Sequence, residues 1–469
     1  MTFINELQSL LGRYALVKDA DKAPFLTDER GRYHGDAVAV ALPATHEEVM
    51  KVMTLAERYQ IPVVTQGGNT STVGGSVPLP SSNALLLSLK RMRSIFSIDP
   101  VSDTIHAQAG VTLTEVHEAA ESINRLFPLR LASEGTATVG GLLASNAGGT
   151  EVLRYGMTRD LVLGYRAVLA DGREINELTS LRKNNSGYDL RDLLIGSEGT
   201  LAVITEAILK LHPRPLDRKV LFLSLKDLKS VEVVFNAFNA KMHAQMTAFE
   251  LMGRPTLNKL ALMMPEVRQP EVEKTDWHVF IECSYFEANP DTSTLESVLE
   301  SLMEKGVVVD GAISETEDDA KDFWRVRESI PPAHKKAGGN VKHDIALPRH
   351  RLVEFIESVC AALKEKYDWL EPSVFGHYGD GNLHFNMGVE APNDPKIVFT
   401  VEKDIHAFVY EKVIAMGGTI SAEHGIGQLK RDAMTMAKDP VALEMMQAIK
   451  KAFDPDNRLN PGKLLPKNS

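Results

Sequence analysis

The chain has 469 residues, more than a single hydrophobic core usually organises, so two or more domains are expected. Hydrophobic residues make up 43% and charged residues 25%, a balance typical of folded globular proteins. The formal charge of −11 argues against general binding to nucleic acids or anionic membranes, although a few cations in a cleft can still attract an anionic substrate. The two cysteines, Cys283 and Cys360, are too few and too far apart for a disulfide framework or a thiolate metal cluster.

Residues 1–22 predict no targeting segment. They lack the basic leader, apolar stretch and small-residue cleavage site of a signal peptide, and they are more acidic than an organelle presequence. No segment approaches the roughly 18 apolar residues that a membrane helix needs. From these observations we expect a cytoplasmic protein without a membrane span.

The first half is expected to contain alternating strands and helices. Residues 37–43 are predicted to form a buried strand. Thr45, followed three residues later by Glu48, has the spacing of a capping box that opens the next helix. Further strands are predicted at residues 104–110, 164–172 and 200–213.

Prolines 213 and 215 mark the expected end of the first domain, because proline interrupts helix and sheet alike. Beyond them, strand-like and helix-like segments predict an α+β domain with an antiparallel sheet under helices. Residues 324–328 are expected to precede a loop. The predicted domains span residues 1–215, 216–420 and 421–469.

Three glycine-rich segments lie in the first half, at residues 66–75, 135–149 and 196–200. Glycines let backbone N–H groups approach a pyrophosphate closely, and neighbouring Thr, Ser and Asn side chains can add donors. Each segment alone is explained equally well as a tight turn. None of them follows the dinucleotide fingerprint G-x-G-x-x-G or the P-loop pattern, so a Rossmann site and a nucleoside-triphosphate loop are disfavoured.

Residues 63–78, 138–156 and 179–205 resemble the FAD-binding segments of the vanillyl-alcohol oxidase/p-cresol methylhydroxylase superfamily, and the resemblance covers nearly the whole chain. It implies an α+β fold with a two-subdomain FAD-binding domain. It also implies an α+β substrate (cap) domain built on an antiparallel sheet, and a C-terminal helical segment that returns to the flavin.

The resemblance further implies which residues contact FAD. Some members tether the flavin covalently, and His34 is the one nearby candidate here, but we expect non-covalent FAD. The implied FAD-binding residues are Gln66, Gly67, Gly68, Asn69, Thr70 and Gly74 at the pyrophosphate, Gly135, Thr138, Gly141, Asn146 and Gly148 along the adenosine and flavin, Gly199 and Ile204 over the dinucleotide, and Asn460 near the C-terminus.

A candidate metal site lies in the second half. His377 and His384 flank a Gly-Asp-Gly turn, and Glu423 and His424 lie at a second turn. Two imidazoles and a carboxylate would form the open site that a catalytic Zn²⁺ requires, although a lone loop histidine is more often structural. Both segments resemble the 2-hydroxy-acid dehydrogenase branch, which includes D-lactate, glycolate and D-2-hydroxyglutarate dehydrogenases. By that resemblance His377, His384 and Glu423 bind Zn²⁺ or another divalent metal, and His424 is the catalytic base.

The substrate is expected to be a small (R)-2-hydroxy acid. As isolated charges, Arg327 and Lys342 are explained as solvated side chains. In the branch, however, Arg327 corresponds to an arginine that grips a carboxylate, and Lys342 and Asn386 are typical of D-2-hydroxyglutarate dehydrogenases. Pro331 departs from that subgroup, which has threonine there, and proline cannot donate a hydrogen bond. D-2-hydroxyglutarate or a relative such as D-malate is therefore expected, with D-lactate or glycolate as the alternative.

The implied reaction is hydride transfer from the substrate to flavin N5 while His424 takes the hydroxyl proton. An electron-transfer flavoprotein or a quinone is the expected electron acceptor, and a homodimer is the expected assembly. Two rivals from other classes are a flavin oxidase that passes electrons to O₂ and a non-catalytic flavoprotein subunit.

Overall fold

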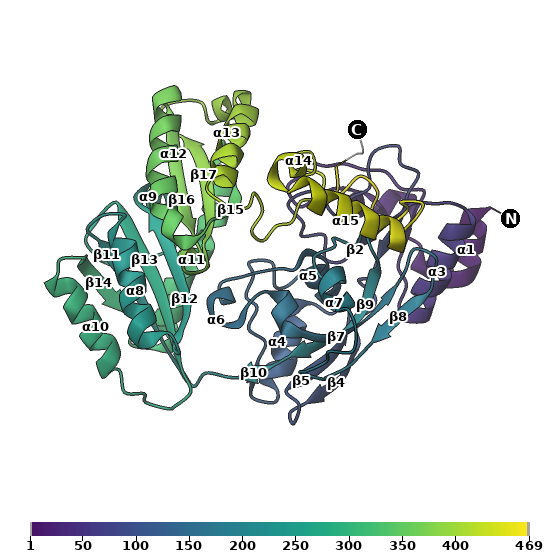
Figure 1. The fold of residues 1–469 in the computed structure, drawn as a ribbon, viewed down its shortest axis with the longest axis horizontal. Coiled ribbons are helices and arrows are strands. Elements are labelled where there is room, and N and C mark those ends of the chain that lie inside the picture. The colour runs from purple at the N-terminus through teal and green to yellow at the C-terminus, as the bar shows by residue number, and fades with distance from the viewer. Residues whose placement is uncertain (1, 467–469) are drawn as a thin grey trace. The chain divides into compact units, whose positions relative to one another are not determined.

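The structure is a computed structural model that describes residues 2–466 (Figure 1). It divides into two compact units, described separately below. The first unit contains the residues up to Gly149, Gly156–Arg214 and the chain from Glu423 onward. The second contains Thr150–Tyr155 and Pro215–Ala422. The short segment Thr150–Tyr155, expected in the first domain, therefore groups with the second unit.

The first unit has two main sheets. The smaller is parallel, in the order β1-β3-β2, and the larger is antiparallel, in the order β4-β5-β9-β7-β8. The strands are β1 (Ala39–Ala41), β2 (Val63–Gln66), β3 (Leu85–Ser88), β4 (Ile95–Asp99), β5 (Thr104–Gln108), β7 (Val162–Val168), β8 (Glu174–Glu177) and β9 (Val203–Lys210). The longer helices are α1 (Phe3–Leu11), α3 (His46–Arg58), α4 (Leu113–Glu121), α5 (Val139–Ser145) and α15 (Pro440–Phe453).

Helix α3 begins where the capping pattern predicts. The Thr45 hydroxyl accepts a hydrogen bond from the Glu48 backbone N–H at 3.1 Å. The Glu48 carboxylate, however, accepts from the backbone N–H of Ala44, one residue before the cap, at 2.7 Å. The apolar face of α3, which includes Val49 and Val52, then packs on the parallel sheet in one buried cluster. Burying this face stabilises the helix more than its intrinsic propensity does.

The C-terminal segment is held on the same parallel sheet. After α15, the buried Asp454 carboxylate accepts hydrogen bonds from the backbone N–H groups of Arg458 and Leu459, at 3.0 and 2.7 Å. Leu459 then forms a parallel bridge with Val63 of β2. In consequence, residues more than 390 positions apart in the chain lie side by side at the end of β2.

The second unit is built on a seven-stranded antiparallel sheet in the order β14-β11-β13-β12-β16-β17-β15. Helices α9 and α11 cover one face, where they share a buried apolar cluster with the sheet. Helices α8 and α12 contact the other face through aromatic pairs. The strands are β11 (Asp217–Leu225), β12 (Met246–Gly253), β13 (Trp277–Tyr285), β14 (Val308–Ile313), β15 (Asp344–Ala346), β16 (Leu370–Gly376) and β17 (Asn382–Val389). The helices are α8 (Ser230–Met242), α9 (Arg254–Met263), α10 (Ser293–Glu304), α11 (Glu317–Ala337), α12 (Leu352–Lys366) and α13 (Glu402–Ala415).

The expected loop after residue 328 is wrong. Helix α11 continues through Pro331 and Pro332 to Ala337. Two prolines remove two backbone donors from the helix interior and normally break it. Here Val326, Ile330 and other residues of α11 are fully buried against the sheet, and that packing outweighs the lost hydrogen bonds.

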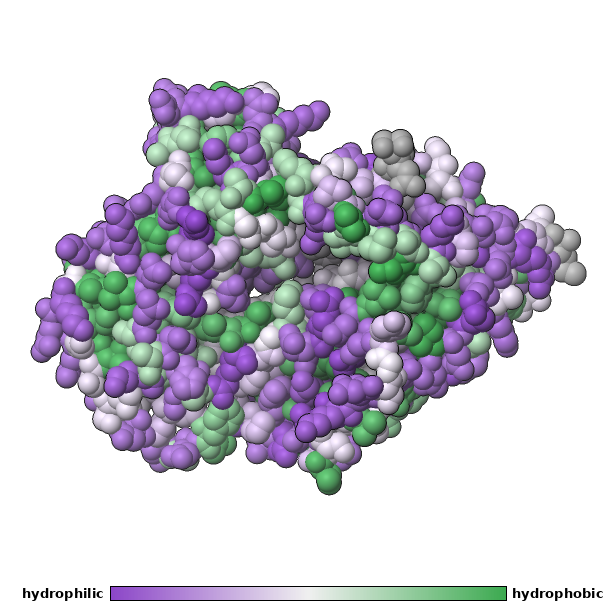
Figure 2. Space-filling view, viewed as in Figure 1, coloured by the Kyte–Doolittle hydropathy of each residue, from purple (hydrophilic) through white to green (hydrophobic). Residues whose placement is uncertain are grey.

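The visible surface is mostly hydrophilic, with apolar side chains gathered in small patches (Figure 2). Among residues 2–466, no helix combines the length and apolar character that crossing a membrane requires.

Candidate active site

The glycine-rich segments meet in the first unit at the end of β2. A Cβ atom on Gly67 would lie 2.3 Å from the Thr138 hydroxyl, and one on Gly68 would lie 1.8 Å from the Thr136 carbonyl oxygen. Gly199 has φ +65°, and its Cβ would lie 2.4 Å from the Thr65 hydroxyl. Glycine is required at these three positions because the loops approach one another too closely for any side chain.

Two polar side chains of the first loop fix its shape. Gln66 is buried and donates to the carbonyl oxygens of Phe25 and Ser76, at 2.9 and 3.0 Å. Asn69, at φ +56°, donates to the Thr27 carbonyl oxygen at 2.8 Å and accepts from the Ser76 hydroxyl at 2.8 Å. These side chains thus brace the loop and leave its backbone, rather than their own amides, as the group presented to a ligand.

Asn460 joins the C-terminal segment to the third loop. Its amide oxygen accepts from the Thr65 backbone N–H at 3.0 Å, and its amide nitrogen donates to the Glu198 carbonyl oxygen at 2.6 Å. The Glu198 carboxylate in turn accepts from the backbone N–H groups of Ile426 and Gly427, at 2.7 and 2.8 Å. Burial raises the pKa of Glu198, and these two donors partly offset the effect.

The first unit contains buried polar groups that a bound FAD could satisfy. Thr138 is buried, and its hydroxyl has no hydrogen-bond partner within residues 2–466. The ammonium group of Lys463 is also buried and unpaired within that range, and burial lowers its pKa to about 7. A dinucleotide carries acceptors for such donors, and buried polar groups are otherwise costly.

The other implied FAD residues are distributed along the same loops. Asn146 ends α5 in the left-handed region at φ 49°, and its side chain accepts from the Arg159 backbone N–H at 2.9 Å. Ile204 is buried in β9, and Gly74 has φ +70°. His34 is exposed, with one ring nitrogen 3.2 Å from the Thr27 hydroxyl and the other 3.1 Å from the Gly31 carbonyl oxygen. The residues Thr70, Gly135 and Gly148 complete the implied set.

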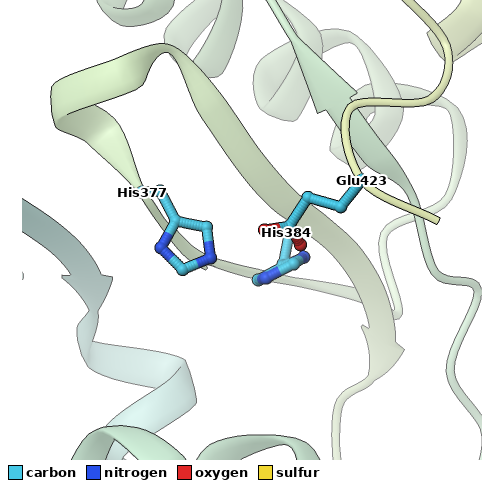
Figure 3. A group of neighbouring side chains, drawn as sticks. All are labelled: His377, His384 and Glu423. Atoms are coloured by element: carbon cyan, nitrogen blue, oxygen red, sulfur yellow. The ribbon is translucent and has the colours of Figure 1, made fainter. Parts of the chain in front are cut away.

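The candidate metal ligands come together at the β16–β17 hairpin (Figure 3). His377 directly follows β16, His384 lies in β17, and ligand atoms of His377, His384 and Glu423 lie within 4.8 Å of one another. Glu423 is bonded to Ala422, the last residue of the second unit, whose backbone N–H donates to the Asp344 carbonyl oxygen of β15. The two-imidazole, one-carboxylate donor set suits a divalent metal and leaves coordination positions open.

His377 has a partner that the sequence did not indicate. Its Nδ1 lies 2.5 Å from the carboxylate of Glu250, which is fully buried in β12. The register Leu251↔Gly376 and Met252↔Phe375 continues to place Glu250 opposite His377. A glutamate inside the apolar run of residues 246–253 was the available signal, but its partner lies 127 positions away.

The second oxygen of Glu250 accepts from Arg327 Nε at 2.5 Å. The Arg327 guanidinium is buried and lies over the Phe375 ring, 5.2 Å from its centroid. Burial alone would raise the pKa of Glu250, but the charge of Arg327 and the hydrogen bonds that His377 and Arg327 donate lower it. Arg327, expected at the substrate carboxylate, therefore has a carboxylate of the protein as its hydrogen-bond partner.

Lys342 and Asn386 lie on the same face of the sheet as His384. The pairs Val341↔Met387 and Asp344↔His384 flank Lys342, and the same antiparallel register places it opposite Asn386. Opposed residues share one face, and so do residues two apart in a strand. Lys342 is half-buried, whereas Asn386 is buried.

The Asn386 amide contacts a second residue that sequence reasoning missed. Its nitrogen lies 3.4 Å from Nδ1 of His334, which α11 brings to the sheet, and the Asn340 amide lies 3.1 Å from the same atom. Burial, together with the charges of Lys259 and Lys342, lowers the pKa of His334 to about 3. His334 is therefore neutral at physiological pH.

His424 lies in a half-buried turn between Glu423 and Gly425. Gly425 and Gly427 have φ +77° and +51°, so the turn depends on glycine at both positions. The Glu198 carboxylate accepts hydrogen bonds from the backbone N–H groups of Ile426 and Gly427, and these bonds fix the turn at the third glycine loop.

Comparison with known families identifies both halves. A model described as the C-terminal domain of FAD linked oxidases matches residues 214–464, and one described as an FAD binding domain matches residues 37–176. The chain belongs to the FAD-linked oxidase family. With the relatives below, these matches confirm the predicted enzyme class, an FAD-dependent 2-hydroxy-acid dehydrogenase.

The dehydrogenase is 36% identical to the D-2-hydroxyglutarate dehydrogenase of Rattus norvegicus over 90% of this chain and 77% of that protein. It is 32% identical to a D-2-hydroxyglutarate–pyruvate transhydrogenase of Saccharomyces cerevisiae, over 94% of this chain and 89% of that protein. A p-cresol methylhydroxylase structure matches with a TM-score of 0.77 at 16% identity, over 100% of this chain and 97% of that one. This likeness confirms the predicted fold class, and the family models and relatives confirm the predicted resemblance to FAD-dependent 2-hydroxy-acid dehydrogenases.

The prediction of a cytoplasmic location is wrong on this comparison. The D-2-hydroxyglutarate dehydrogenases of rat, cattle and Arabidopsis thaliana are all named as mitochondrial proteins. The prediction rested on the composition of residues 1–22 and on the lack of a long apolar segment, and neither feature identifies the compartment.

The Gly141→Ala substitution tests the FAD contact at α5. A Cβ atom there would lie 3.6 Å from the nearest protein atom, an ordinary contact, so the dehydrogenase should fold with undiminished stability. If FAD lies against Gly141, the added methyl should cost ~1–3 kcal/mol of binding, or roughly ten- to a hundred-fold in affinity. Gly140→Ala is the contrast, since its Cβ would lie 2.8 Å from the Ala109 Cβ and should lower stability instead.

FAD content is measured by acid precipitation, which releases non-covalent flavin into the supernatant, and stability is measured as the Tm of the flavin-free protein. A Gly141→Ala enzyme that retains FAD with wild-type affinity contradicts the assigned contact. A yellow pellet after precipitation contradicts non-covalent binding.

The buried His334 should make the enzyme sensitive to acid. Its folded-state pKa of about 3 lies below its unfolded value near ~6.5, so the unfolded state binds more protons. The contribution of His334 to the free energy of unfolding is therefore fully present above about pH 6.5. It declines as the pH falls, by ~2 kcal/mol between about pH 7 and pH 5. The free energy of unfolding is measured in urea at the two pH values. His334→Gln should abolish the ~2 kcal/mol difference between them, whereas substitution of the exposed His243 by Gln should leave it unchanged. Equal pH dependence in wild type and His334→Gln would refute the assignment.

Proposed function

We propose that the dehydrogenase oxidises D-2-hydroxyglutarate, or a related (R)-2-hydroxydicarboxylate such as D-malate, to the 2-oxo acid. The observation that carries this proposal is the arrangement on one sheet face of a candidate metal ligand, His384, with Lys342 and Asn386. The relatives named as D-2-hydroxyglutarate dehydrogenases support the same substrate class. When bound, FAD would accept the two electrons from the substrate.

His377, His384 and Glu423 would hold the divalent metal, for which Zn²⁺ is the proposed identity. Such a metal supplies Lewis acidity that lowers the pKa of a coordinated hydroxyl. His424 is the proposed base, because a neutral imidazole is the side chain that most often accepts a proton in general-base catalysis. Glu423 and His424 are adjacent in a glycine-hinged turn, so one short segment supplies both a ligand and a base.

Lys342 is the proposed partner of the second carboxylate. Arg327 already donates to Glu250, and Pro331, one helical turn further along α11, offers no N–H donor. With His334 neutral, Lys342 supplies the positive charge beside Asn386. We propose that FAD is held without a covalent tether, that an electron-transfer flavoprotein or a quinone reoxidises the enzyme, and that it assembles as a homodimer.

Substrate choice is tested by removing Lys342. A charge-assisted hydrogen bond to a buried carboxylate commonly contributes ~1.5–3 kcal/mol, so Lys342→Ala should reduce kcat/KM for D-2-hydroxyglutarate by about ten- to a hundred-fold. D-lactate has no second carboxylate, and its kcat/KM should hardly change. Lys336→Ala, which removes an exposed lysine of α11, is the matched control.

The measurement is steady-state turnover on both acids with an artificial electron acceptor, after anaerobic mixing with a panel of (R)- and (S)-2-hydroxy acids to find which ones bleach the flavin. A wild type that prefers D-lactate or glycolate would replace the dicarboxylate assignment with the monocarboxylate alternative. A flavin that no 2-hydroxy acid reduces would indicate a non-catalytic subunit. Fast reoxidation by O₂ would indicate an oxidase.

Substitutions of the adjacent residues Glu423 and His424 should have different effects on metal content and turnover. Glu423→Ala should lose both bound metal and activity, because it removes a ligand. His424→Ala should lower turnover by ~10²–10⁴-fold and keep the metal, because it removes a general base. Metal content by elemental analysis and turnover are measured on the same samples. Equal metal loss in both variants would show that the two roles are not divided in this way.

A further inference from the structure

Glu250 is a charged residue in the interior of the second unit's sheet. Its side chain is fully buried in β12, where every residue from Met246 to Gly253 is buried. An ionised carboxylate in such a place is costly unless both oxygens are paired. Both are paired, one with His377 Nδ1 and one with Arg327 Nε, each at 2.5 Å.

We propose that Glu250, clamped by Arg327, is a positioning residue for the metal ligand His377. This inference rests on the proposed metal-dependent function. Because an ionised carboxylate is only an acceptor, Nδ1 of His377 carries the proton and donates it to Glu250. The imidazole lone pair is then on Nε2, the atom left to bind a metal. The carboxylate also makes Nε2 a stronger electron-pair donor to a metal, as carboxylates hydrogen-bonded to metal-binding histidines do.

Arg327 gives the carboxylate a fixed orientation. A carboxylate bound through one oxygen can turn about its Cγ–Cδ bond, but Glu250 is held at both ends. Arg327 is itself held between Glu250 and the Phe375 ring, and Phe375 pairs across the hairpin with His384. One buried unit therefore reaches both histidines, His377 by a hydrogen bond and His384 through the sheet register.

The simpler explanation is that Glu250 and Arg327 form an ion pair that only fastens α11 to the sheet. A neighbouring residue allows the two explanations to be separated. Glu282 in β13 is also buried, and it accepts from the Trp324 indole of α11 at 2.6 Å and the Thr247 hydroxyl at 2.7 Å. It thus fastens the same helix to the same sheet, but none of its hydrogen bonds in the described chain goes to a candidate metal ligand.

The test compares Glu250→Gln with the matched Glu282→Gln in the FAD-loaded enzyme. The affinity for Zn²⁺ is measured by competition with a chromophoric chelator at fixed pH, and FAD content is measured in parallel. Glu250→Gln should weaken Zn²⁺ binding by ~10–100-fold, the usual effect of losing the hydrogen-bond partner of a metal-binding histidine. Glu282→Gln should bind Zn²⁺ as the wild type does. In Co²⁺-substituted enzyme, only Glu250→Gln should shift the visible ligand-field bands.

A double-mutant cycle gives the decisive readout. If Glu250 acts through His377, adding Glu250→Gln to His377→Ala should cause little further loss of Zn²⁺ affinity. Should Glu250→Gln fail to fold because Arg327 is left unpaired, Glu250→Gln/Arg327→Met removes both buried charges and should show the same weakened binding. Wild-type Zn²⁺ affinity in Glu250→Gln or in Glu250→Gln/Arg327→Met would overturn the inference and leave the proposed function standing. An equal loss of Zn²⁺ affinity in Glu282→Gln would do the same. A wild type that binds no divalent metal would overturn the metal-dependent function itself.

Discussion

The buried carboxylate of Glu250 is the interaction on which the candidate metal site depends. It joins three elements that are distant in sequence: β12, the turn after β16, and α11. Removing one partner of a buried ion pair typically costs ~3–5 kcal/mol, because the other charge stays behind without compensation. The position of α11 over the sheet and the orientation of His377 are therefore set by one network, and neither can change alone.

The register of the antiparallel sheet determines which side chains share the site. In β17, His384 and Asn386 are two residues apart and so face the same side, and the pairing with the chain before β15 puts Lys342 on that side too. A slip of one residue would turn all three to the opposite face. The same strand β15 holds the segment that leads to Glu423, through the bridge of Ala346 with Thr419. A single sheet edge thus organises the candidate metal ligands and the proposed substrate contacts.

The sequence was sufficient to predict those elements and site residues that can be recognised from residue type and spacing along the chain. Periodic apolar residues indicated the strands and α3, and the glycine-rich loops and the two histidine segments carried the family resemblance. It was insufficient where a contact joins distant segments. Nothing near Glu250 indicates His377, and nothing near Asn386 indicates His334, because strand register and helix placement bring these pairs together. The loop expected at Pro331 was wrong for the same reason, since burial of α11 overrides a local helix-breaking signal.

The charge balance of the site follows from burial. The chain as a whole carries a formal charge of −11, which would repel a dianion at long range. On the face of the sheet where Lys342 and Asn386 lie, however, Arg327 is already neutralised by Glu250, and burial keeps His334 neutral. A second cation on His334 would be repelled by Lys259 and Lys342, the two charges that help to lower its pKa. The neutral His334 contacts the amide of Asn386, and the strand register puts Asn386 opposite Lys342, the residue proposed as the partner of the second carboxylate.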